Sequence, residues 1–198
     1  MAFTPPLTFT VQSELDAVNQ MLMSIGQAPI NTLEVDGISD VSFARLILHN
    51  TSREVQNKGW SFNSEKCFPL SADGAGEIAF PANALSCDPS DKDENLIERA
   101  RKLYDLENHT FNIGRTVDVD VKWFFEFEDL PQSARAYIAH MAGRIFQAQL
   151  VGAQVLYQFT KEREIECLTN LERDELKKKD SNLFKSNTRA NRIFHRRW

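Results

Sequence analysis

The first third of the chain constrains the fold most strongly, because it holds two helix-forming stretches joined by a short connector. In both stretches apolar residues recur every three or four positions, which is the spacing of a helix with one buried face. Asp36-Gly37 in the connector is a turn signal. The pattern predicts helices over residues 14–25 and 41–58 that fold back on each other as a hairpin.

The ends of these two predicted helices carry residues that typically start and stop helices. Ser13 can cap the first helix, and Gly26 followed by Pro29 can end it. Gly59 can end the second helix because glycine adopts the left-handed C-terminal conformation without steric cost. We expect the next residue, Trp60, to bury its ring in the core while its indole N–H finds a hydrogen-bond partner.

After the second helix the period changes, and Pro, Gly and Asp residues divide the chain into short apolar pieces such as residues 78–80. Residues 88–95 are polar enough for an exposed turn, and residues 96–104 fit either a strand or a short helix. The clearest strand is residues 116–128, where apolar and charged residues alternate. Phe124 interrupts the charged face, and an exposed Phe124 would make that face a candidate contact surface.

Two further helices are predicted in the last third of the chain. Pro131 suits the first position of a helix, and an apolar face with helical spacing continues to Val151. A second helical pattern follows Gly152, and its last part is polar enough to be mainly solvated. The closing segment has little periodicity.

The order of these elements predicts an α+β fold, with an antiparallel helical bundle of about four helices, an inserted antiparallel β region and an extended C-terminal arm. A length of 198 residues agrees with one main core that carries an insertion. The expected parts are an N-terminal helical hairpin over 1–63, the β region over 64–128, the C-terminal helices over 129–180 and a basic extended tail over 181–198.

Charge is distributed unevenly along the chain. The net charge is −5, but residues 1–180 carry −10 and residues 181–198 carry +5. No acidic residue follows Asp180. A basic end segment of this kind is typically an interaction arm for an acidic protein surface or a phosphate backbone.

Composition excludes several classes of protein. With 42% hydrophobic and 26% charged residues, the chain can bury a core and is not of the disordered class. No apolar run approaches the roughly 20 residues of a membrane span, and the first ten residues lack the pattern of a signal peptide. Cys67, Cys87 and Cys167 are widely separated, which favours neither a disulfide framework nor a metal knuckle and fits a reducing cytoplasm.

No catalytic signature occurs in the sequence. Glu126, Glu128 and Asp129 lie near aromatic residues and could suggest the carboxylate pair of a glycoside hydrolase, but alternating charges on a solvated strand explain them better. Cys167 fits a small core residue better than a reactive thiol. We expect no enzyme activity and no catalytic, cofactor-binding or metal-binding residue. The histidines, which lack metal-ligand spacing, are His49, His109, His140 and His195.

Two groups of residues form a more specific pattern. The first group is Ala17-Val18-Asn19, Leu22, Ser24-Ile25-Gly26, Pro29, Thr32-Leu33-Glu34, Ala44, Arg45, Leu48, Gln56 and Gly59-Trp60-Ser61-Phe62-Asn63, and the second is Leu130-Pro131, Tyr137-Ile138, Ala142 and residues 144–146. Through these residues the chain resembles the tail tubular protein A family, the adaptor or gatekeeper subunits that join portal to nozzle in short-tailed phages.

The resemblance implies a virion protein, made in the host cytoplasm, that forms a dodecameric ring beneath the portal protein. It also implies a tail nozzle protein (tail tubular protein B) below the ring and tail fibres around the junction. DNA would be retained and later pass through the lumen without sequence-specific binding. An acidic body suits such a channel because negative walls repel phosphates.

We expect the basic tail to dock on the portal protein, with a DNA-binding tail or a merely solubilising end as the alternatives. Apolar residues between the basic ones favour a protein partner, because aromatic and Arg side chains often carry much of the binding energy of an interface. The predicted portal-docking residues are Lys185, Arg189, Arg192, Phe194, Arg196, Arg197 and Trp198.

Overall fold

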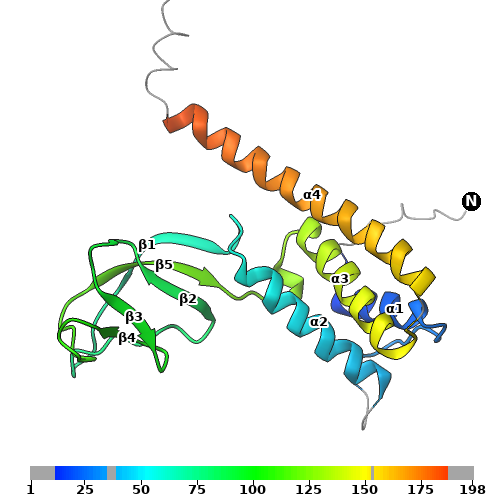
Figure 1. Cartoon of the computed structure of the whole chain (residues 1–198), viewed down its shortest axis with the longest axis horizontal. Helices are drawn as coiled ribbons and strands as arrows, with labels where there is room; N and C mark the ends of the chain where they lie inside the picture. Colours follow the sequence, from blue (N-terminus) through cyan, green and yellow to red (C-terminus); the bar gives the residue numbers. More distant parts are fainter. Residues whose placement is uncertain (1–11, 35–38, 153, 187–198) are drawn as a thin grey trace, which may run out of the picture. The chain divides into compact units, whose positions relative to one another are not determined.

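The computed structural model describes residues 12–34, 39–152 and 154–186 (Figure 1). These residues form four α-helices and five β-strands, which confirms the predicted α+β fold. None of the described helices combines the length and the apolar content needed to cross a membrane.

The chain divides into two compact units. The helical unit comprises residues 1–51 and 127–173, and the sheet unit comprises residues 52–126 and 174–198. Two of the unit boundaries, at 51/52 and 173/174, fall inside the helices α2 (Asp40–Asn57) and α4 (Gln154–Ser186), and the third lies between residues 126 and 127.

The helical unit is built from α1 (Glu14–Ser24), α3 (Gln132–Leu150), the first parts of α2 and α4, and the short 3-10 helix η1 (Phe127–Asp129). Its core follows the predicted apolar faces in part, because Val151, at the end of the expected face of the third helix, is 47% exposed. The fully buried side chains of this core include Val18, Met21, Leu22, Leu130, Ile138, Phe146 and Leu171.

The start of α1 is fixed by a capping box. The Asp16 N–H donates to Ser13 Oγ at 3.1 Å, and the Ser13 N–H donates to Asp16 Oδ2 at 3.0 Å. These bonds satisfy two backbone donors that a helix otherwise leaves free. The predicted N-cap at Ser13 is confirmed, and the helix ends within one residue of its predicted C-terminus.

The helices α3 and α4 are joined through an ion pair on the helical unit. The Arg144 guanidinium donates to the Glu164 carboxylate, and both side chains are mostly buried.

Cys167, on the buried side of α4, is a small core residue as predicted, and burial raises the pKa of its thiol. Pro131 is the N-cap of α3 and therefore lies one position before the place that the sequence suggested.

The sheet unit contains a three-stranded antiparallel sheet and a β-hairpin. The sheet has the order β1 (Ser64–Leu70), β5 (Val117–Trp123), β2 (Ala84–Pro89). The hairpin, β3 (Leu96–Arg99) with β4 (Lys102–Asp105), settles the ambiguity over residues 96–104 in favour of strands. One core contains the apolar face of the sheet and the inward residues of the hairpin: Leu70, Ile78, Phe80, Ala84, Cys87, Leu96, Leu103, Val117, Val119 and Val121.

The clearest predicted strand is confirmed over half of its length. Along β5, Val117, Val119 and Val121 are buried while Asp118 is exposed, as the alternation requires. The strand ends at Trp123 and not at residue 128, because the Trp123 and Phe124 N–H groups bond to carbonyls outside the strand ladder.

Phe124, whose exposure would have made the charged face a candidate contact surface, is not exposed. Its side chain is half-buried, its N–H donates to the Asn83 carbonyl at 2.7 Å, and the Arg53 guanidinium lies 5.9 Å from the centre of its ring. Phe124 is thus held by neighbours in the sheet unit and does not form a free contact surface.

The passage from α2 into β1 is held by two buried amide side chains, Gln56 and Asn63. Gln56 accepts from the Phe125 N–H at 2.8 Å and donates to the Phe125 carbonyl at 2.9 Å. Asn63 donates to the carbonyls of Gln56 and Trp123, at 2.8 and 2.9 Å. These bonds join the end of α2 to the residues that follow β5, and we refer to them as the amide junction.

Trp60 lies in the turn between Gln56 and Asn63, the two residues of the amide junction. Its indole N–H donates to the Val55 carbonyl at 2.8 Å, and Gly59 before it has a φ of +77°, as the predicted left-handed cap requires. The ring is only half-buried, so the expectation of a fully buried Trp60 was wrong. The turn leaves one side of the ring at the surface because the chain enters β1 only four residues later.

The last part of α4 belongs to the sheet unit and contacts the same turn. The buried Glu175 carboxylate accepts from the Ser61 N–H at 2.9 Å and from the Ser61 hydroxyl at 2.7 Å. α4 continues to Ser186, so residues 181–186 are helical although we placed them in the extended tail. No Gly or Pro interrupts these residues, and a helix continues readily through such a sequence.

Replacing Gln56 with Leu tests how much the amide junction contributes to stability. Leu keeps the side-chain volume but leaves the Phe125 N–H and carbonyl without their partner, and each such buried group costs about 1–3 kcal/mol. We expect Gln56→Leu to lower the free energy of unfolding by about 3 kcal/mol in urea titrations followed by circular dichroism. The exposed Gln149 offers a matched control, and Gln149→Leu should stay within about 0.5 kcal/mol of wild type. Equal effects of the two substitutions would show that the junction is not specific.

Candidate interaction surfaces

The predicted portal-docking residues lie almost entirely beyond the described part of the chain. Lys185 belongs to the last turn of α4, and only the backbone of this turn is described. The other six residues, Arg189, Arg192, Phe194, Arg196, Arg197 and Trp198, fall after residue 186 and outside the described residues. The docking role of this segment therefore stays a prediction.

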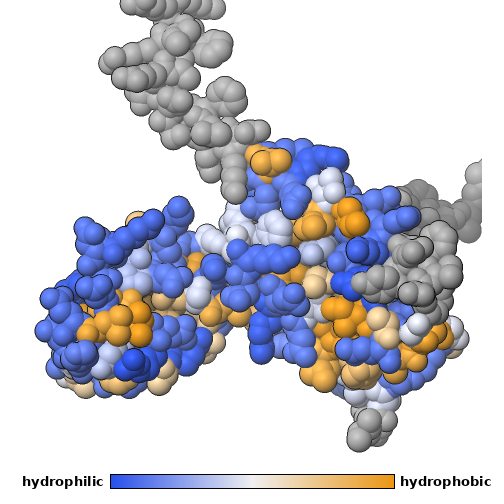
Figure 2. All heavy atoms as spheres, in the orientation of Figure 1, coloured by the Kyte–Doolittle hydropathy of each residue, from blue (hydrophilic) through white to orange (hydrophobic). Residues whose placement is uncertain are grey.

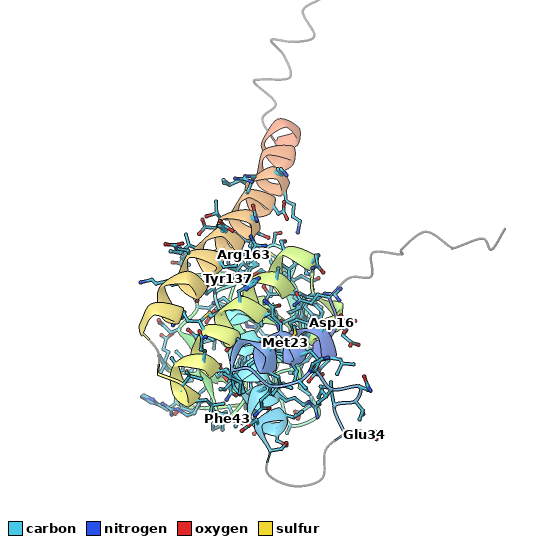
Figure 3. All side chains as sticks on the ribbon, turned by 90° about the vertical axis from the view of Figure 1, so that its right-hand side faces the viewer. Asp16, Met23, Glu34, Phe43, Tyr137 and Arg163 are labelled. Carbon is cyan, nitrogen blue, oxygen red and sulfur yellow. The ribbon has the colours of Figure 1, made fainter. Side chains whose placement is uncertain are left out.

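Large apolar side chains are exposed on every α-helix of the helical unit. They are 44–56% exposed and occur at the end of α1, in α2, at the end of α3 and in α4. Figure 2 shows hydrophobic side chains gathered on one face of this unit, and Figure 3 shows Met23 and Phe43 among its side chains. Such exposed groups typically mark contacts with other proteins. The residues are Met23, Leu46, Leu150, Val151 and Ile165.

Within the helical unit, α4 buries only a narrow stripe. Cys167 and Leu171 are buried, whereas most described neighbours, including Glu166, Thr169 and Glu172, are exposed. A helix that covers a core usually buries a wider face than this. Much of the described surface of α4 is therefore available to a partner.

The sheet unit carries an open groove of about 670 Å³ at one end of its core. The inner surface is aromatic, with Phe62, Phe68, Trp123 and Phe125 all half-buried. Phe68 and Trp123 form a T-shaped pair with ring centres 5.3 Å apart. We refer to this site as the aromatic groove, and its volume falls within the range of known ligand pockets.

Glu65 places one carboxylate in the wall of the aromatic groove. The Trp123 indole N–H donates to Glu65 Oε2 at 3.1 Å, which fixes the carboxylate beside the ring. The alternating pattern of residues 116–128 places Trp123 and Phe125 on the apolar face of a strand and gives no sign of a groove. The missed signal was the concentration of aromatic residues at 60–68 and 123–127, on both sides of the inserted strands.

The outer face of the three-stranded sheet carries three aspartates and also Lys122, which is paired with Ser86, and we refer to it as the acidic face. Asp88 on β2 is paired with Asp120 on β5, and Asp118 is exposed two residues before Asp120. Like charges placed opposite each other destabilise a sheet unless donors compensate them. Asp120 Oδ1 accepts from the Ser90 hydroxyl at 2.7 Å and from the Cys67 N–H at 3.2 Å, and these two bonds lower the pKa of Asp120.

The geometry supplies no support for the hydrolase alternative. Glu126, Glu128 and Asp129 are exposed, and none of them lines the aromatic groove. His140 is half-buried beside Gln20, and burial is the main cause that lowers its pKa. Among the described residues, no group of His, Cys, Asp and Glu side chains is arranged to hold a metal ion.

Comparison with known proteins identifies a protein family that this chain matches. The family described as tail tubular protein matches residues 15–181, which is most of the chain. The tail tubular protein A of Klebsiella phage KP34 is 27% identical to this chain over 153 residues, covering 76% of this chain and 81% of the phage protein.

Substitution of Asp120 tests the electrostatics of the acidic face. Because the folded pKa is below the ordinary value near 3.8, ionised Asp120 stabilises the fold above that pH and loses this effect as the pH falls through the folded pKa. We expect Asp120→Asn to lower the free energy of unfolding by about 1 kcal/mol at pH 7, the net value of such hydrogen bonds, and by less at pH 3. Urea titrations at both pH values measure the difference.

The control for this substitution is Asp118→Asn, which removes an exposed carboxylate from the same strand and should change stability by less than about 0.5 kcal/mol. A loss from Asp120→Asn that is as large at pH 3 as at pH 7 would contradict the assigned role of the ionised carboxylate.

Proposed function

Because the chain belongs to the tail tubular protein family and is therefore a structural protein of a phage tail, we propose that it is the adaptor ring subunit between the portal and the tail nozzle. The family match carries this proposal, because it extends through residues of both units. The subunit works by geometry and has no catalytic role: it matches the ring above to the tube below, and tail fibres attach around the junction.

The basic tail is the proposed contact with the portal protein. Its basic residues begin with Lys185 in the last turn of α4 and continue beyond the helix, and the segment has no acidic residue to neutralise them. Arg and aromatic side chains suit a desolvated protein interface, and the +5 charge would be attracted to an acidic portal surface. The proposed docking residues are Lys185, Arg189, Arg192, Phe194, Arg196, Arg197 and Trp198.

The helical unit supplies the proposed contacts between subunits of a dodecameric ring. Its exposed apolar residues occur on all four helices, so more than one face can be covered when copies assemble head to tail. Heterologous contacts of this type close into a ring when the rotation between copies fits. Attachment to the portal would set that rotation, and subunits would remain single before it.

The acidic face of the sheet is the proposed surface toward DNA. Asp88, Asp118 and Asp120 repel phosphate groups, so DNA can be retained near this surface and later pass it without being bound. Such a role needs no base contact.

A DNA-binding protein that uses the same tail is the second candidate, and the +5 charge of residues 181–198 favours it. The −10 charge of the rest of the chain opposes it. Binding to duplex DNA would be identified by a steep decrease of affinity with salt.

Neutralising the tail tests the portal contact. A full-length variant with Arg189→Gln, Arg192→Gln, Arg196→Gln and Arg197→Gln should bind the portal ring of the same phage at least about tenfold more weakly, a loss of about 1.4 kcal/mol or more. Light scattering of mixtures with purified portal rings measures the added mass, and wild type should add many copies per ring.

The matched control removes the same charge from exposed lysines of the body, with Lys66→Gln, Lys92→Gln, Lys161→Gln and Lys177→Gln. This variant should bind the portal like wild type. Equal loss in both variants would mean that only net charge matters, and absence of wild-type binding would reject the portal role. If wild type does not bind the portal but does bind duplex DNA, the DNA-binding function would be favoured.

A further inference from the structure

The aromatic groove exposes a surface that a folded chain normally covers. Phe62, Phe68, Trp123 and Phe125 leave part of their rings open, although Phe68 and Trp123 pack against the core of the sheet unit. Among the described residues that line the groove, Asn63, Ser64 and Asn83 add neutral polar groups, and Glu65 adds a charge. An occupant of this groove therefore needs apolar or aromatic side chains for the floor and a positive charge for Glu65.

The two terminal segments outside the described residues differ in whether they contain both apolar side chains and a positive charge. Residues 1–11 contain apolar residues but no charged one. Residues 187–198 contain four arginines together with Ile193, Phe194 and Trp198. An arginine can pair with the Glu65 carboxylate and lie over the Trp123 ring at the same time, which combines an ion pair with a cation–π contact.

The chain also has the length to bring this segment to the groove. α4 passes the groove at Lys178, whose ammonium lies 6.0 Å from the centre of the Phe62 ring. From Lys178 to the end of α4 at Ser186, the helix rises by about 12 Å at 1.5 Å per residue. The twelve residues that follow can span up to about 40 Å when extended. The C-terminus can therefore return to the groove of its own subunit.

We propose that residues 192–198 of this chain dock in the aromatic groove of the same sheet unit while the subunit is free. Phe194 and Trp198 provide the aromatic groups for the floor, and an arginine of the segment pairs with Glu65. This contact involves only the subunit itself, so it does not rest on the proposed role at the portal.

The test uses full-length protein with the segment disabled by Arg192→Ser, Phe194→Ser, Arg197→Ser and Trp198→Ser. A labelled synthetic peptide of residues 187–198 is titrated into this variant and into wild type, and fluorescence anisotropy reports binding. A tethered segment competes at a local concentration on the order of 1 mM. For a peptide that binds with a Kd of about 10 µM, wild type should therefore bind it about 100-fold more weakly than the variant.

The groove itself is tested in the disabled background. Glu65→Gln should weaken peptide binding at least about tenfold, whereas Asp118→Asn on the opposite face of the sheet should not. A peptide carrying a photoreactive benzophenone in place of Phe194 should cross-link to residues 62–68 or 123–125. Thermal unfolding of each variant confirms that it is folded.

The proposal would be overturned by equal peptide binding to wild type and the disabled variant, by equal binding of a scrambled peptide, or by absence of binding to the disabled variant. Dimers of wild type that the disabled variant does not form would place the segment in the groove of a second copy, which also contradicts docking in the same subunit.

Discussion

The sheet unit depends on two buried side-chain amides that complete the hydrogen bonds of the backbone where the chain enters and leaves the sheet. An amide side chain has both a donor and an acceptor, so Gln56 can pair with the N–H and the carbonyl of Phe125 as a neighbouring strand would. Asn63 does the same work for the carbonyls of Gln56 and Trp123. Without them, several polar backbone groups would be buried without partners, which costs more than the bonds themselves contribute.

The residues of this junction are also those that made the sequence recognisable. Gln56 and the run 59–63 carry much of the resemblance to the tail tubular protein A family, and each has a physical task here. Gly59 reverses the chain at a positive φ, Trp60 closes the last turn of α2, and Ser61 binds the Glu175 carboxylate of α4. The pattern thus reflects a joint between helix and sheet, which suits a protein whose function depends on shape.

Local patterns predicted most of the fold, and tertiary contacts explain the rest. The capping box of α1 and the alternation along β5 depend on neighbouring residues, so the sequence was sufficient for both. The β3–β4 turn was not predictable, because Ala100 and Arg101 adopt positive φ without glycine. That conformation is held by the Arg101 guanidinium, which donates to the carbonyls of Pro81, Ala82 and Ala84 from a distant segment. The aromatic groove was missed for the same reason, because its walls come from segments about 60 residues apart.

The two proposed contacts of the basic tail exclude each other, since both use the same arginines and aromatic residues. A tail that occupies its own groove for about 99% of the time would reduce its apparent affinity for a portal about 100-fold, because only the free fraction can bind. A portal ring offsets this loss by presenting many sites at once, whereas another free subunit does not. The positive charge of the tail would therefore be covered by the groove in single subunits and become available at a portal ring. In this arrangement the opposite charges of body and tail serve assembly by delaying contact until the correct partner is present.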